Sequence, residues 1–138
     1  MNLFETKYRH PYNYHPDYQK RVAYFSMEFA VDQSLKTYSG GLGFLAGSHM
    51  KSAFELKQNL VGIGILWKLG YYDQSRKQDQ SMDVLFLEKS YSFLEDTGIK
   101  FTVEINSHPV WVTAKYLSPH YFHTVPMFFL TTDVPEND

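Results

Sequence analysis

Three glycines within four positions give this sequence its strongest chemical signal. Gly40, Gly41 and Gly43 stand at the start of an amphipathic pattern that predicts a helix. Glycines let the backbone approach a ligand closely, and the amide N–H groups and dipole at the start of a helix favour an anion. We therefore expect this segment, the glycine turn (residues 39–43), to bind a phosphate group. The alternative is that the glycines serve only a tight turn against a sheet.

Two titratable side chains are candidates for a site near the glycine turn. Glu28 follows an apolar run, residues 22–27, that predicts a buried strand. Ligands bind outside the carboxyl ends of strands in open α/β sheets, so Glu28 is a candidate cleft residue, with loop capping as the alternative. His49 falls on the apolar stripe of the predicted helix. We favour a core or boundary histidine there and keep His49 as a second candidate cleft residue.

The glycine turn also matches a dinucleotide-binding pattern. Residues 41–46 read G-x-G-x-x-A, but more than ten residues separate them from the preceding predicted strand. The pattern should follow its strand directly and be accompanied by an acidic residue that holds a ribose. The next predicted strand has no acidic residue, so we disfavour a nicotinamide dinucleotide.

A strand-helix-strand unit is predicted to position these residues. The helix begins at residue 42 or 43 and ends near residue 58, and a second buried strand follows at residues 60–66. Gly62 and Gly64 share one face of this strand, which would let the helix or another segment approach closely. The crossover is expected to be right-handed. Spacings of three and four place these residues on the helical stripe facing the sheet: Leu42, Leu45, Ala46, His49, Met50, Ala53 and Phe54.

The remaining segments predict an arm and an antiparallel meander. Residues 1–20 show no regular period, and we interpret them as an arm packed by Tyr and Phe side chains. Residues 68–83 are polar and predict a surface excursion or a small hairpin, and residues 88–95 show a weak helical pattern. A turn at residues 106–109 separates the first two of three β-like runs. The runs are residues 100–105, 110–117 and 125–130.

Composition and charge argue against several classes of partner. The 138 residues carry a formal net charge of -2 without a basic cluster, so we expect neither nucleic acid nor an anionic membrane as a partner. The sequence has no cysteine, which fits a reducing compartment, and we expect the cytoplasm. No run of about 20 apolar residues predicts a membrane span. His120 and His123 would point to opposite faces of an extended segment, so no metal site is expected.

Six blocks of sequence stand in a characteristic order. They are VAYFSMEF (22–29), YSGGLGFLAG (38–47), HMKSA (49–53), LVGIG (60–64), GYYDQ (70–74) and VPMFFLTTDVPEN (125–137). In this order they resemble the bacterial α-glucan phosphorylases, the glycogen, starch and maltodextrin enzymes, over most of residues 21–138. Ser48 departs from the family pattern, which often has Asp at this position, and the role of that carboxylate does not carry over.

The resemblance implies an α/β fold. Residues 21–138 would form an incomplete, Rossmann-like N-terminal half of a GT-B glycosyltransferase, with a βαβ unit and an antiparallel β meander. It implies glucosyl transfer between the non-reducing end of an α-1,4-glucan and inorganic phosphate, giving glucose 1-phosphate. Glu28 would lie at the cleft, near the sugar. The positions that the resemblance places against the substrate phosphate and the glucosyl unit are Gly40, Gly41, Leu42 and Gly43.

The family also uses pyridoxal 5'-phosphate, bound by a lysine. The resemblance places that lysine, and the C-terminal domain that carries it, outside the 138 residues of this sequence. The chain is therefore expected to be an N-terminal fragment that is inactive alone and needs its C-terminal domain as a partner.

Two other functions stay open at this point. A nucleotide-sugar glucan synthase shares the fold and a G-G-L-G turn, but synthases usually have Lys two residues before the first glycine and Asp after the third. Tyr38 and Phe44 occupy those positions here, which favours a phosphorylase. The second alternative is a non-catalytic module that binds glucan or another protein. The sequence predicts no particular oligomeric state.

Overall fold

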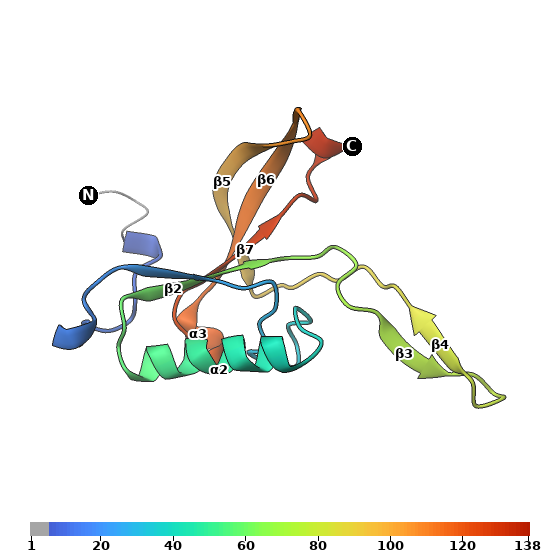
Figure 1. Ribbon diagram of the computed structural model, residues 1–138, viewed down its shortest axis with the longest axis horizontal. Helices are drawn as coiled ribbons and strands as arrows, with labels where there is room; N and C mark the ends of the chain where they lie inside the picture. Colours follow the sequence, from blue (N-terminus) through green and yellow to red (C-terminus); the bar gives the residue numbers. More distant parts are fainter. Residues whose placement is uncertain (1–5) are drawn as a thin grey trace.

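The computed structural model describes residues 6–138 as a five-stranded mixed sheet with a 15-residue helix against it (Figure 1). The strands lie in the order β1-β2-β7-β6-β5. The first three run parallel, and β6 is antiparallel to both β7 and β5. The elements are β1 Val22–Phe25, α2 Gly41–Glu55, β2 Leu60–Ile65, β5 Leu94–Ile105, β6 His108–Leu117 and β7 Met127–Thr131.

The predicted strand-helix-strand unit is confirmed. The helix α2 connects β1 to β2, and the two strands pair in parallel. Gly62 leaves room for the helix, because a side-chain carbon at this position would lie 2.8 Å from the Met50 sulfur. Met50, Met127 and Phe129 are fully buried in the core between α2 and the sheet. The α/β character predicted from the sequence is therefore present.

The buried face of α2 differs from the predicted stripe by about one position. Leu42 and Leu45, which were predicted to face the sheet, are 55% and 67% exposed. The apolar pattern did not reveal this face because glycine adds little hydrophobicity, although it allows the helix backbone to lie directly against the chain. The predicted stripe correctly included the buried residues Ala46, Met50 and Ala53. The buried residues of α2 are Gly43, Ala46, Gly47, Met50 and Ala53.

The prediction that residues 22–27 form a strand covered on both faces is wrong. β1 is shorter and lies at the edge of the sheet, where Phe25 is 70% exposed. Among residues 6–138, β1 pairs with β2 alone. Its apolar sequence would suit a buried strand, but burial depends on neighbours that the run itself does not specify.

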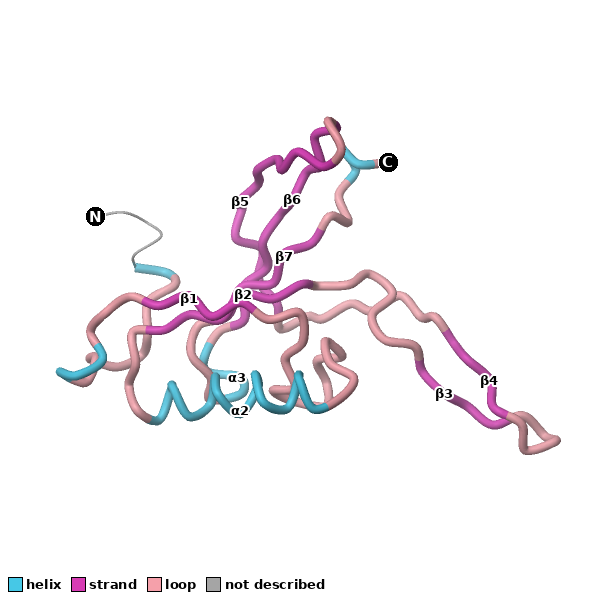
Figure 2. The backbone as a smooth tube through the Cα atoms, in the orientation of Figure 1, coloured by secondary structure: helices cyan, strands magenta, loops and turns pink. Residues whose placement is uncertain are grey.

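Between β2 and β5 the chain leaves the sheet in the excursion, residues 66–93. It carries a hairpin of β3 Asp73–Arg76 and β4 Met82–Leu85, which projects away from the sheet between two stretches of loop (Figure 2). The polar pattern of residues 68–83 predicted such a hairpin. The helix predicted at residues 88–95 is wrong: Tyr91 and Phe93, two residues apart in non-helical chain, both pack against the core before β5 begins.

β5, β6 and β7 form the predicted antiparallel meander. Asn106 and Ser107 have φ values of 50° and 63°, which are typical of the two-residue type I′ turn that joins paired strands. Pro109, predicted in the turn, instead belongs to β6 and lies opposite Glu104. The paired part of β7 does not reach this end of β6, so the missing N–H of Pro109 interrupts no pairing with β7. The short helices α3 Pro119–Phe122 and η2 Pro135–Asn137 flank β7 in sequence.

The N-terminal segment of the described chain packs along the sheet through aromatic rings and backbone hydrogen bonds. The ring centroids of Tyr8 and Tyr116 are 4.7 Å apart. The His15 amide donates to the Lys57 carbonyl at 3.1 Å, just before η1 Pro16–Tyr18. Phe4, which the arm prediction included, lies outside the described residues. Within residues 6–138, every helix is too short or too polar to cross a membrane.

Candidate functional site

Glu28 lies against the glycine turn, three residues after the end of β1. Its Oε2 accepts hydrogen bonds from the amides of Ser39 (3.1 Å) and Gly40 (3.4 Å). Its Oε1 accepts from the hydroxyls of Ser39 and Tyr71, each at 2.9 Å. These four donors match the roughly four acceptor positions of a carboxylate. Glu28 and the turn therefore form one hydrogen-bonded unit, although more than ten residues separate them.

The Glu28 carboxylate is ionised at neutral pH. The Ser39 amide, assisted by the Tyr71 and Ser39 hydroxyls and the Gly40 amide, lowers the pKa of Glu28 from 4.5 to about 2, against the opposing effect of burial. Within residues 6–138, no lysine, arginine or histidine forms an ion pair with this carboxylate. Uncharged donors and the positive end of the α2 dipole hold the charge. So low a pKa makes Glu28 unsuitable as a general acid near neutrality.

Two glycines near the start of α2 are required by packing. A side-chain carbon at Gly43 would lie 2.5 Å from the Tyr38 Cβ. At Gly47 it would overlap the Ala30 carbonyl oxygen. We call Gly43 and Gly47 the packed pair, because each lets the helix lie directly against the chain that leads to it.

The other two glycines of the turn have no such requirement. Apart from the adjoining backbone, a side-chain carbon at Gly40 or Gly41 would have no atom of residues 6–138 within 4 Å. We call these residues the open pair. Packing therefore does not require glycine at either position. A ligand could occupy the space that a side chain would fill there.

The first three amides of α2 are available as hydrogen-bond donors. The amides of Gly41, Leu42 and Gly43 have no acceptor among residues 6–138, and the helical pattern begins where the Phe44 amide donates to the Gly40 carbonyl at 3.2 Å. Such groups at a helix start need a partner outside the helix. The Gly40 N–H is not among these free donors, because it donates to Glu28 Oε2 at 3.4 Å. Gly41 and Leu42 are exposed and can offer their amides to oxygens of a ligand, whereas Gly43 is buried.

Apolar and aromatic side chains border the glycine turn. The rings of Tyr38 and Phe44 meet edge to face with centroids 5.5 Å apart. Phe44 is 59% exposed. Exposed apolar surface beside a set of polar donors is common where a protein contacts a ligand or another protein surface.

His49 is not part of this unit. It is exposed rather than buried on the predicted stripe, and its ring lies 4.9 Å from the Tyr24 ring. Within residues 6–138, no hydrogen bond connects it to Glu28 or to the glycine turn. Eight positions of helix separate it from Gly41, about 12 Å along the axis. His49 thus lies apart from the turn, and its place in a cleft stays a prediction.

Tyr71 and Ser39 contact Glu28 but were not among the candidate site residues. Tyr71 follows β2 as Glu28 follows β1, and the carboxyl ends of these parallel strands lie at the same edge of the sheet. The rule that identified Glu28 could therefore have identified Tyr71. The polar sequence around it instead suggested a surface excursion.

The described residues contain no cluster of three or more His, Asp and Glu side chains that could hold a metal ion. His120 lies in α3 and His123 caps it, so this segment is helical rather than extended as predicted. Both histidines are exposed.

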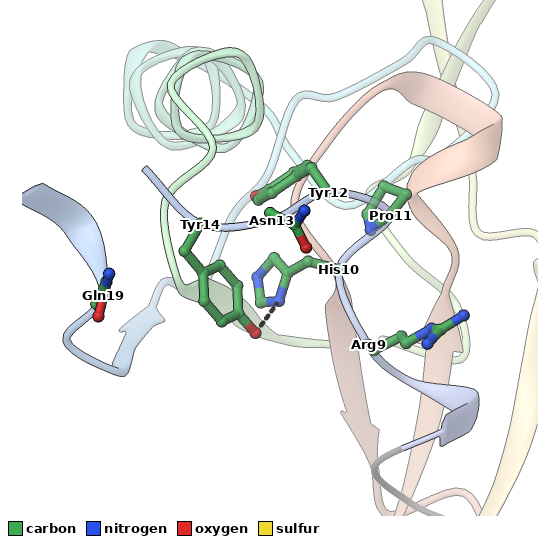
Figure 3. Close-up of a pocket in the computed structure, with 7 residues that line it drawn as sticks. All are labelled: Arg9, His10, Pro11, Tyr12, Asn13, Tyr14 and Gln19. Carbon is green, nitrogen blue, oxygen red and sulfur yellow. Dashed lines mark hydrogen bonds between the residues drawn. The ribbon is translucent and has the colours of Figure 1, made fainter. Parts of the chain in front are cut away.

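A separate concavity of about 730 Å³ lies beside the N-terminal segment (Figure 3). His10 connects this segment to β2, because its Nε2 donates to the Leu60 carbonyl (2.7 Å) and its Nδ1 accepts from the Tyr14 hydroxyl (3.2 Å). Burial lowers the pKa of His10, which favours the neutral ring. None of the candidate site residues lines the concavity. Its lining is Arg9, His10, Pro11, Tyr12, Asn13, Tyr14 and Gln19.

Several proteins are similar to this chain over most of its length. An uncharacterized protein of Methanocaldococcus jannaschii, MJ1631, is 56% identical over 86% of the chain. A glycogen phosphorylase of Mycobacterium tuberculosis is 34% identical over 85% of it, and a maltodextrin phosphorylase of Thermococcus litoralis is 31% identical over 99%. This chain contains a phosphorylase-like region. No family model matches it.

The phosphorylase-like region is a small part of these relatives. The chain spans 23% of the Methanocaldococcus protein, 14% of the glycogen phosphorylase and 18% of the maltodextrin phosphorylase. The similarity to the maltodextrin phosphorylase covers almost the whole chain, so Glu28, the glycine turn and Tyr71 all lie within it.

Proposed function

We propose that this chain forms one side of the substrate site of an α-glucan phosphorylase. The reaction moves a glucosyl unit between the non-reducing end of an α-1,4-glucan and inorganic phosphate, giving glucose 1-phosphate. The observation that carries the proposal is the similarity of 85% to 99% of the chain to a glycogen phosphorylase and a maltodextrin phosphorylase. Because the chain corresponds to 14% and 18% of those enzymes, we assign it only part of the site. In this proposal, that part belongs to the Rossmann-like N-terminal half of a GT-B fold.

The unpaired amides at the start of α2 are the groups proposed to bind substrate. Gly41, Leu42 and Gly43 would donate hydrogen bonds to oxygens of the substrate phosphate or the glucosyl unit. Donors held in place by a helix stabilise charge that develops as the glycosidic bond breaks, without reorganising during the reaction. The open pair supports this role because it leaves the approach to these amides clear.

Glu28 is proposed to shape the site rather than to transfer a proton. Its four hydrogen bonds occupy the carboxylate, and its pKa of about 2 keeps it ionised. Its negative charge beside Ser39 and Gly40 disfavours a second anion there. A phosphate group is therefore expected at the Gly41 and Leu42 amides, because Gly43 also lies close to the Glu28 carboxylate.

The proposed enzyme would use pyridoxal 5'-phosphate bound by a lysine outside this sequence. Three lysines beside a concave surface do not fit a cofactor lysine, because the amino group of each is already engaged by a carboxylate at 2.7 to 2.9 Å. No residue of this chain is assigned to the cofactor. The three pairs are Lys68–Asp133, Lys89–Asp73 and Lys115–Asp96.

Assays of the complete gene product separate the three functions. With maltoheptaose and orthophosphate, formation of glucose 1-phosphate would support the phosphorylase proposal. Glucosyl transfer from ADP-glucose, with no glucose 1-phosphate formed, would favour a synthase and contradict it. Saturable binding of maltoheptaose without either reaction would favour a non-catalytic glucan-binding module.

A further inference from the structure

Tyr71 connects the excursion to the glycine turn. It lies six residues after the end of β2, and its hydroxyl donates to Glu28 Oε1 at 2.9 Å. The other three donors to Glu28 come from Ser39 and Gly40. Tyr71 is therefore the one donor to this carboxylate, among residues 6–138, that comes from outside the turn.

A second set of contacts joins the excursion to the loop that leads into the turn. The Lys36 amide donates to the Tyr91 hydroxyl at 3.1 Å. Gly70 has a φ of 58°, and a side-chain carbon there would lie 2.9 Å from the Lys89 side chain and 3.5 Å from the Lys36 carbonyl. Glycine thus lets the chain turn in a tight space immediately before Tyr71. The excursion holds the loop at more than one point.

We propose that Tyr71 is a positioning residue that sets the orientation of the glycine turn through Glu28. This inference rests on the proposed function, in which the amides of residues 41–43 bind substrate. One Glu28 oxygen accepts from the turn amides, and the other accepts from the hydroxyls of Ser39 and Tyr71, so Tyr71 helps to fix the carboxylate that anchors the turn. Tyr71 itself does not contact substrate in this arrangement.

The neighbouring tyrosine provides a matched control. Tyr72 is 48% exposed, and its hydroxyl accepts from Gln74 Nε2 at 3.4 Å rather than contacting Glu28. Tyr71→Phe keeps the aromatic ring and leaves Glu28 with three donors, so the fold is expected to persist. Burial raises the pKa of Tyr71, which keeps its hydroxyl protonated and able to donate.

Carbon-13 NMR titration of the Glu28 carboxyl and hydrogen exchange at the Ser39 and Gly40 amides test the connection in the complete protein. Tyr71→Phe is expected to raise the Glu28 pKa from about 2 toward 4.5. It is also expected to speed exchange at both amides about tenfold, because one charge-assisted hydrogen bond is lost. Tyr72→Phe should change neither, and in a Glu28→Gln background Tyr71→Phe should not speed exchange further.

The inference is overturned if Tyr71→Phe leaves the Glu28 pKa and the amide exchange unchanged, or if Tyr72→Phe alters them equally. Kinetics distinguish its failure from failure of the proposed function. If glucose 1-phosphate forms, Tyr71→Phe should lower kcat/KM while Tyr72→Phe does not, and an unchanged kcat/KM overturns the inference. If none forms, the proposed function fails, and a Tyr71-specific change at Glu28 still supports the connection.

Discussion

The packed pair and the open pair place the same residue type in two different environments. Gly43 and Gly47 lie where any side-chain carbon would meet Tyr38 or the Ala30 carbonyl. At Gly40 and Gly41, a side-chain carbon would have no atom of the described residues within 4 Å apart from the adjoining backbone. Both pairs belong to one helix start, and only the first pair is explained by the fold.

Under the proposed function, this difference would separate folding from binding within one glycine-rich segment. The packed pair lets α2 lie against the loop that carries Glu28. The open pair would keep the approach to the unpaired amides clear. Substitutions in the packed pair should therefore reduce stability, and substitutions in the open pair should affect binding.

The largest expected effect on stability is at Gly47. Glycine to alanine normally stabilises a helix interior by up to about 1 kcal/mol. Gly47→Ala should instead cost about 3 kcal/mol in the free energy of unfolding, because the new methyl group overlaps the Ala30 carbonyl and the backbone must shift. Chemical denaturation measures this, with the exposed neighbour Ser48→Ala as the control. Equal free energies of unfolding for Gly47→Ala and Ser48→Ala would contradict the claim that packing requires glycine at position 47.

A smaller loss is expected at Gly43, where the neighbour is a side chain. Gly43→Ala should cost about 1 to 2 kcal/mol, since its methyl group would lie 2.5 Å from the Tyr38 Cβ and 3.1 Å from Glu28 Oε2. The same denaturation experiment in a Tyr38→Gly background should show a smaller loss. If the loss stays the same, contact with Tyr38 is not its cause.

The Glu28 anchor predicts a pH dependence. The folded pKa of about 2 lies below the ordinary 4.5, so the ionised carboxylate stabilises the fold above pH 4.5, and this contribution is lost as the pH falls from 4.5 toward 2. Wild type should be more stable than Glu28→Gln at pH 7, and the difference should shrink by pH 2.5. A difference in unfolding free energy that is the same at both pH values would contradict the anchor.

The smallest effect on stability is expected in the open pair. Gly41→Ala should change the free energy of unfolding by no more than about 0.5 kcal/mol, because the methyl group meets nothing. Thermal and chemical denaturation beside Gly43→Ala provide the comparison. A loss as large as that of Gly43→Ala would mean that the two pairs do not differ.

The sequence predicted where helices and strands occur better than it predicted which of their residues are buried. The apolar runs of β2 and β7 and the helical period of α2 are local signals, and they located the βαβ unit and the meander correctly. The exposure of Phe25 was missed because it depends on what lies beside β1. The buried face of α2 was missed because Gly43 and Gly47 carry no hydrophobic signal.

The candidate site shows the same limit. Local chemistry identified the glycine turn and Glu28 as separate candidates. It did not reveal that Glu28 occupies the Gly40 amide, nor that Tyr71 reaches the same carboxylate across 43 residues of sequence. These contacts depend on how β1 and β2 align at one edge of the sheet. His49 was singled out because of its place on a stripe that proved to be rotated.

The most direct test of the difference between the two pairs is the rate of glucose 1-phosphate formation by the complete gene product carrying Gly41→Ala. The methyl group would add bulk beside the amides that are proposed to bind substrate, without meeting a neighbouring part of the fold. We predict that kcat/KM falls at least about tenfold, as when a donor to the transition state is obstructed, while Ser48→Ala keeps the wild-type value. A Gly41→Ala enzyme with wild-type stability and wild-type kcat/KM would contradict the assignment of the open pair to substrate binding.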